Sequence, residues 1–115
     1  WSETTPLLNT LNFRYGATTW NAHRIHYDGD YTRIEEGYPA IVSNGGLSMH
    51  LMVDAALKHA KGTLTGYTAR LVHPLWVGDR IEVRGETRDA DGKLRLWAAD
   101  KTGTLCGEMD LEFHS

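Results

Sequence analysis

Residues 47–61 read LSMHLMVDAALKHAK, and this stretch decides the fold because its polar side chains recur at helical spacing. His50, Asp54, Lys58 and Lys61 are three or four residues apart, which places them on one side of an α-helix. Almost every other position in the stretch is apolar. The pattern predicts a helix over approximately residues 46–61 that is buried on most of its circumference.

Both ends of this helix carry capping signals. Ser43 or Asn44 can accept a hydrogen bond from the first turn as the N-cap residue. Lys58 and His59 lie near the negative end of the helix dipole, where positive charge is stabilising. Gly62 is predicted to end the helix in a left-handed conformation.

Beyond the helix, apolar and polar residues alternate with a period of two, which is typical of β-strands. Turn signals separate the strands at Gly78-Asp79, Asp91-Gly92 and Thr102-Gly103. The alternation predicts an antiparallel sheet with one solvated face, and in the last strand Leu105, Met109, Leu111 and Phe113 are expected to share the buried face. The five predicted strands cover residues 6–13, 63–73, 80–88, 93–101 and 104–113.

A long apolar helix with about five antiparallel strands is an α+β layer arrangement. A sheet that wraps around the helix would bury it on most sides, which is the geometry of a hotdog fold. With 115 residues and 41% hydrophobic content, the chain suffices for one such domain over residues 1–115. The chain begins at Trp1 rather than Met, which leaves open whether an N-terminal portion is missing.

Charge and cysteine content exclude several classes of protein. The net charge of -3 provides no basic surface for nucleic acid, so no nucleic-acid partner is expected. Cys106 is the single cysteine, which excludes an internal disulfide and favours a packing role over a nucleophile. Neither an apolar run of about 18 residues nor a leader-like segment is visible, so we expect a cytoplasmic protein that does not enter a membrane.

The residues most suggestive of chemistry lie in two stretches before the helix. Residues 13–28 read FRYGATTWNAHRIHYD and place His23 and His26 three residues apart, with no apolar run to explain the cluster. Residues 37–46 read GYPAIVSNGG and end in paired glycines where the helix begins. An acid/base group that faces the start of a buried helix is the arrangement that these stretches suggest. His26 could equally be a surface or capping histidine, and no further ligands at metal spacing accompany the two histidines, so no metal is predicted.

These two stretches resemble the MaoC-like hotdog hydratases and dehydratases. The similarity is greatest to the branch with mesaconyl-CoA and itaconyl-CoA hydratases and the mitochondrial 3-hydroxyacyl-thioester dehydratases. Residues 70–85 (RLVHPLWVGDRIEVRG) and 96–109 (LWAADKTGTLCGEM) are also similar to that branch. The resemblance implies a hydro-lyase that reversibly adds water across the C2–C3 double bond of an enoyl thioester. It needs no cofactor beyond the CoA or acyl-carrier-protein arm of its substrate.

The resemblance also implies roles for individual residues. The wider group carries the pattern Asp-x-Asn-Pro-(apolar)-His, which places the catalytic histidine on His26 and Asn21 where the group has its aspartate. Asparagine cannot exchange a proton, so His26 is expected to act as acid and base while Asn21 orients the water. In the nearer branch, the form Asn-x-His-Arg-Ile-His-Tyr-Asp is normal.

At the helix start, the resemblance implies that the backbone N–H near Gly45 binds the thioester oxygen. Asn44 stands where the family usually has histidine. Asn44, Gly46, His23 and Arg24 complete the predicted substrate-binding residues.

Two competing functions remain open on the same fold. A thioesterase would need a carboxylate such as Asp28, Asp30 or Glu36 to activate water. A non-catalytic hotdog subunit that pairs with an active half would explain the asparagines at positions 21 and 44. A lone hotdog leaves an exposed sheet edge, so a homodimer or a heterodimer of hotdog domains is expected in either case.

Overall fold

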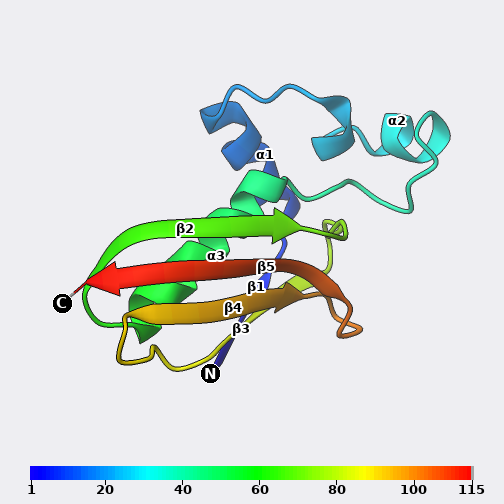
Figure 1. Ribbon diagram of the computed structural model, residues 1–115. Helices are drawn as coiled ribbons and strands as arrows, with labels where there is room; N and C mark the ends of the chain where they lie inside the picture. Colours follow the sequence, from blue (N-terminus) through cyan, green and yellow to red (C-terminus); the bar gives the residue numbers. More distant parts are fainter. Residues whose placement is uncertain (115) are drawn as a thin grey trace.

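A computed structural model describes residues 1–114 and has one antiparallel sheet of five strands in the order β1-β3-β4-β5-β2. The sheet curves around one side of α3, while α1, η1 and α2 gather beyond the N-terminal end of that helix (Figure 1). The hotdog prediction is confirmed, since a helix packs against a five-stranded antiparallel sheet. The elements are β1 (Ser2–Pro6), α1 (Asn9–Thr18), η1 (Arg24–His26), α2 (Gly29–Ile34), α3 (Gly45–His59), β2 (Thr63–Leu71), β3 (Arg80–Gly85), β4 (Lys93–Ala99) and β5 (Leu105–His114).

The central helix α3 forms where the sequence predicts it. Asn44 is its N-cap, and the Asn44 side chain accepts a hydrogen bond from the Gly46 N–H at 2.9 Å. Gly62 does not end the helix, because α3 already stops at His59 and Ala60 is extended. Gly62 instead has φ +106° and lies against the backbone of His114, where a larger residue would clash.

α3 is covered over most of its circumference, as predicted, because Met49, Leu51 and Val53 are partly buried against the core on either side of the fully buried face. The fully buried face consists of Leu47, Ser48, Met52, Ala55 and Ala56. The open side carries both the predicted polar stripe and Leu57, which is 50% exposed.

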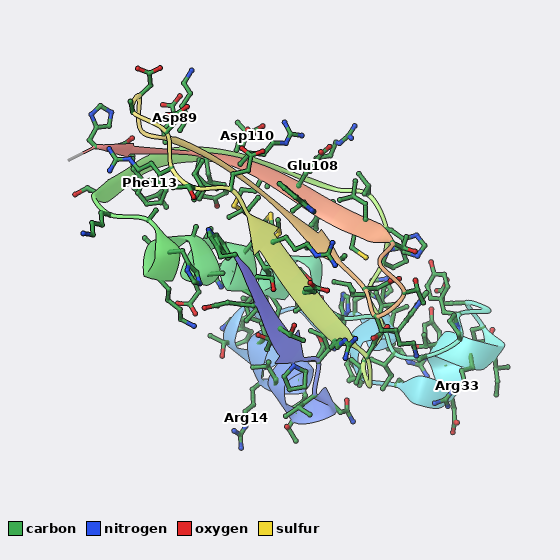
Figure 2. The ribbon with its side chains drawn as sticks, turned by 90° about the horizontal axis from the view of Figure 1, so that it is seen from below. Arg14, Arg33, Asp89, Glu108, Asp110 and Phe113 are labelled. Carbon is green, nitrogen blue, oxygen red and sulfur yellow. The ribbon has the colours of Figure 1, made fainter. Side chains whose placement is uncertain are left out.

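The sheet follows the predicted alternation over most of its length. Figure 2 shows Phe113 on the helix side of the sheet and Glu108 and Asp110 on the opposite side. Leu105 departs from the prediction, because it is 40% exposed while Cys106 and Gly107 are both buried. A register shift between Ala98 and Ala99 of the neighbouring strand explains this difference, since a β-bulge resets which side chains face inward.

The prediction for the N-terminal segment is wrong. Residues 6–13 were expected to form a strand, but the strand is Ser2–Pro6 and α1 begins at Asn9. β1 is a polar strand at the edge of the sheet, and its partner β3 is about 80 residues away along the chain. No local apolar pattern therefore reveals β1. Leu7, between β1 and α1, is buried, and α1 turns Asn12 into the interior.

Among residues 1–114, no helix combines the length and the apolar character needed to cross a membrane. The prediction of a single domain over residues 1–115 stays a prediction.

Candidate active site

His26 ends the short helix η1 and is held in one tautomer by the backbone. Its Nδ1 lies 2.8 Å from the carbonyl oxygen of Val42. A carbonyl can only accept a hydrogen bond, so Nδ1 carries the proton in the neutral ring. The lone pair of Nε2 is then available to take a proton from another group.

Asn12 of α1 links the loop of His26 to the loop before α3. Its side-chain NH₂ donates to the carbonyl oxygens of His26 at 2.8 Å and Val42 at 3.3 Å. Its Oδ1 accepts from the Asn44 N–H at 2.8 Å. Asn12 is only 1% exposed, so α1 fixes the distance between His26 and the start of α3 through one buried amide. Sequence reasoning missed Asn12, although an amide between Leu11 and Phe13 is the kind of interruption that marks a buried polar contact.

Gly45 is the first residue of α3, and its N–H cannot bond within the helix. No other group in the described part of the chain accepts this N–H. Gly45 and His26 line the same cavity of about 320 Å³, together with Ser43, Ser48, Leu71 and Cys106. His26, which has a free ring nitrogen, and Gly45, at the positive end of α3, therefore line one cavity.

Leu71, at the end of β2, lies directly against Gly45 in this cavity. A Cβ at position 45 would be 2.7 Å from Leu71 Cδ1, and one at Gly107 would be 3.2 Å from Leu71 Cδ2. Gly45 and Gly107 therefore leave room for the end of the Leu71 side chain at the start of α3.

Asn21 lies on another side of His26. Both residues border a separate hollow of about 230 Å³ with Asn12, Phe13 and Tyr27. The exposed Asn21 side chain accepts a hydrogen bond from the His23 N–H at 3.1 Å. Asn21 and Gly45 thus approach His26 from different hollows, and only His26 belongs to both.

His23 and Arg24 are exposed, and their side chains contact neighbouring residues of the same segment. The His23 ring accepts a hydrogen bond from the Ile25 N–H at 3.3 Å and lies 6.1 Å from the His26 ring. Arg24 pairs with Asp28 at 2.9 Å and lies over the Tyr31 ring. Neither residue borders the cavity shared by His26 and Gly45.

Asn44 and Gly46 have structural surroundings as well. Asn44 is buried and caps α3, as described above. A Cβ on Gly46 would lie 2.6 Å from the hydroxyl oxygen of Tyr15, so this glycine permits α1 to pack on α3. Neither residue borders the cavity, and Gly45 is the glycine of the pair that does.

The carboxylates considered for a thioesterase lie away from the cavity. Asp28 caps α2 by accepting the Tyr31 N–H, and this bond, followed by the Arg24 guanidinium, lowers the pKa of the Asp28 carboxyl. Glu36 accepts a hydrogen bond from the Tyr31 hydroxyl at 2.9 Å, and Asp30 is exposed. Within residues 1–114, no three His, Cys, Asp or Glu side chains converge as metal ligands.

Comparison with known families identifies the chain. Residues 1–77 match the model of the family described as hydroxyacyl-thioester dehydratase type 2. The chain belongs to this family. The predicted resemblance to the mesaconyl-CoA hydratase and mitochondrial dehydratase branch is thereby confirmed. A mesaconyl-C(4)-CoA hydratase of Chloroflexus aurantiacus is a relative with 38% identity over 104 residues, which cover 81% of this chain and 36% of the relative. This member of the dehydratase family therefore spans about a third of the length of that relative.

Solved structures agree on the fold. A MaoC-like dehydratase from Phytophthora capsici superposes with a TM-score of 0.89 at 16% identity, covering 100% of this chain and 40% of that one. A chain of the ChsH1-ChsH2 complex from Mycobacterium tuberculosis superposes with a TM-score of 0.80 at 16% identity, covering 99% and 94% of the two chains. At these identities the likeness establishes the hotdog fold of the family member and nothing finer.

Proposed function

We propose that this chain acts on an acyl thioester as a hydratase or dehydratase, reversibly adding water across the C2–C3 double bond of an enoyl thioester. The observation that carries the proposal is the shared cavity of His26 and Gly45. The hydrogen bond from His26 Nδ1 to Val42 leaves Nε2 as a base, and the N–H of Gly45 has no acceptor among the described residues. Family membership supports the same reaction type.

In the proposed mechanism, His26 carries both proton transfers. Nε2 removes a proton from water as the water oxygen bonds to C3, and the C2–C3 electron pair moves toward the thioester carbonyl. The resulting enolate oxygen is stabilised by the Gly45 N–H and the positive end of α3. The protonated His26 then donates its proton to C2, which completes the addition, and dehydration is the reverse sequence. A positioned acid/base of this kind contributes about 10²–10⁴-fold.

Asn21 is proposed to hold the water, because its amide can donate and accept hydrogen bonds but cannot take up a proton. Its side chain borders the second hollow and not the Gly45 cavity, so this role requires the substrate C3 to reach the Asn21 side of His26. The substrate's CoA or acyl-carrier-protein arm is the only carrier the reaction requires.

The test is the loss of enoyl-thioester absorbance when the purified chain is mixed with crotonyl-CoA or mesaconyl-CoA. The proposal predicts a decrease without release of free thiol. Release of CoA thiol would instead indicate a thioesterase, which no carboxylate in the cavity favours.

A non-catalytic subunit is the second candidate, and Asn21 is the observation that favours it, because the wider group has an aspartate there. The chain also spans only 36% of the mesaconyl-C(4)-CoA hydratase. This candidate predicts no change in absorbance with the chain alone. Addition of a second hotdog chain that supplies its own active site should then produce the decrease.

We further propose that two hotdog domains pair through the free edge of β2, as a homodimer or a heterodimer. β2 is hydrogen-bonded only to β5 and carries exposed Tyr67, with exposed Leu71 and Val72 at its end. An unpaired edge of this length is a template for another strand. The cytoplasmic location stays a prediction.

A further inference from the structure

Ser43 carries a buried hydroxyl that the protein does not satisfy. The residue is 5% exposed, and within residues 1–114 its Oγ has no hydrogen-bond partner. Folded proteins pair the large majority of their buried side-chain polar atoms, so an unpaired one calls for a physical explanation.

The backbone around Ser43 is fixed on both sides. The Val42 N–H donates to Ile25 at 2.8 Å, and the Ser43 N–H donates to Leu75 at 2.8 Å. The next N–H, that of Asn44, donates to the side chain of Asn12. With three consecutive N–H groups engaged, the Ser43 hydroxyl can change direction only by rotation about χ1, among a few staggered positions.

Ser43 lines the cavity of His26 and Gly45, and its Oγ is buried. Ser43 lies two residues before Gly45, on the other side of the N-cap Asn44. Two residues of the same short segment, one with a side-chain donor and one with a backbone donor, therefore line one cavity. Both donors are unpaired in the described part of the chain.

We propose that the Ser43 hydroxyl donates a hydrogen bond to the thioester carbonyl oxygen, beside the bond from the Gly45 N–H. An enolate oxygen can accept two such bonds, and each strengthens as negative charge develops. Ser43 is therefore a catalytic residue that contacts the substrate oxygen, and the inference rests on the function proposed above.

The test combines activity with thermal stability in Ser43→Ala. Because the Ser43 hydroxyl has no partner among residues 1–114, its removal leaves Tm unchanged or raises it. Loss of one oxyanion donor lowers kcat by about 10²-fold with little change in KM. Ser43→Thr, which keeps a hydroxyl, retains more activity than Ser43→Ala.

Thr32→Val is the matched control for stability. Thr32 is also buried, but its hydroxyl donates to the Asp28 carbonyl at 2.7 Å, so the valine variant has a lower Tm. A comparable fall in Tm for Ser43→Ala shows that the hydroxyl has a structural partner and overturns the proposal. Activity of Ser43→Ala within about twofold of the unmodified chain also overturns it.

The kinetic results also separate failure of the Ser43 inference from failure of the proposed function. A rise in KM for mesaconyl-CoA alone, with kcat unchanged, places the hydroxyl against a substituent of the acyl group and overturns the assignment to the carbonyl oxygen. If the unmodified chain is inactive with both thioesters, the proposed function fails and this inference fails with it. An active chain whose Ser43→Ala variant is equally active overturns the inference alone.

Discussion

At the scale of single residues, the site depends on polar groups with fixed partners. The Val42 carbonyl accepts from both His26 and Asn12, so one oxygen sets the tautomer of the base and its position. Asn12 also accepts the Asn44 N–H that precedes α3. A single buried amide therefore connects the proposed base to the proposed oxyanion donors.

Replacing Asn12 by alanine is expected to destabilise the fold by about 1–3 kcal/mol, because buried carbonyls and an N–H lose their partner. Asn9→Ala, an exposed change on the same helix, is the control and should have a small effect. Urea unfolding measures both. Equal stability of the two variants would contradict the role assigned to Asn12.

Cys106 borders the same cavity but is expected to be inert. Burial raises the pKa of its thiol from 9.0 to about 11, so the thiolate is scarce at neutral pH. Alkylation by iodoacetamide at pH 8 should be much slower in the folded chain than in urea. Rapid modification of the folded chain would contradict the assigned environment.

The same pKa shift predicts a pH dependence of stability. The unfolded thiol ionises at lower pH than the folded one, so the contribution of Cys106 is complete below about pH 9 and is lost between about pH 9 and 11. Cys106→Ala should lose less stability than the unmodified chain across this pH range, as measured by urea unfolding. Parallel losses in the two proteins would contradict the shift.

At the scale of elements, the site forms where the start of α3 meets the end of β2. Gly45 and Leu71 line the same cavity, and Leu71 Cδ1 lies 2.7 Å from the place that a Cβ at position 45 would take. The flexible end of a leucine can move aside, whereas a Cβ at position 45 cannot.

Gly45→Ala is expected to fold, because only a methyl group of Leu71 must shift. Its kcat/KM should fall by about 10²-fold, because the alanine methyl blocks the approach of the thioester oxygen. Gly66→Ala in β2 is the control, since a Cβ there meets nothing within 4 Å. The absorbance assay reads both variants. Full activity of Gly45→Ala would remove the Gly45 N–H from the mechanism.

At the scale of the whole molecule, the sheet has two free edges, β1 and β2, and one open helix face. The proposed pairing uses β2. Tyr67→Glu on β2 should shift the chain toward monomer, whereas Leu8→Glu, beside the opposite edge, should not. Light scattering across a concentration range measures the mass. A dimer that Leu8→Glu disrupts and Tyr67→Glu does not would contradict the proposed edge.

Local patterns predicted the parts of the fold that local physics determines. The period of α3 and the glycine turns between β3, β4 and β5 are visible in the sequence because neighbouring residues produce them. β1 was missed because its partner strand β3 is far away along the chain. Leu105 was assigned to the wrong face because the alternation of apolar and polar residues does not reveal a β-bulge. His26 was found through its cluster and the family resemblance. The roles of Asn12 and Ser43 were not, because a buried hydrogen bond or its absence exists only in the folded chain.

The central claim is that His26 performs the acid/base chemistry. The most direct measurement compares kcat/KM for crotonyl-CoA hydration by His26→Ala and by His23→Ala, an exposed histidine three residues away. The account predicts a loss of at least about 10²-fold for His26→Ala and nearly full activity for His23→Ala. Retained activity in His26→Ala, or an equal loss in both variants, would contradict it.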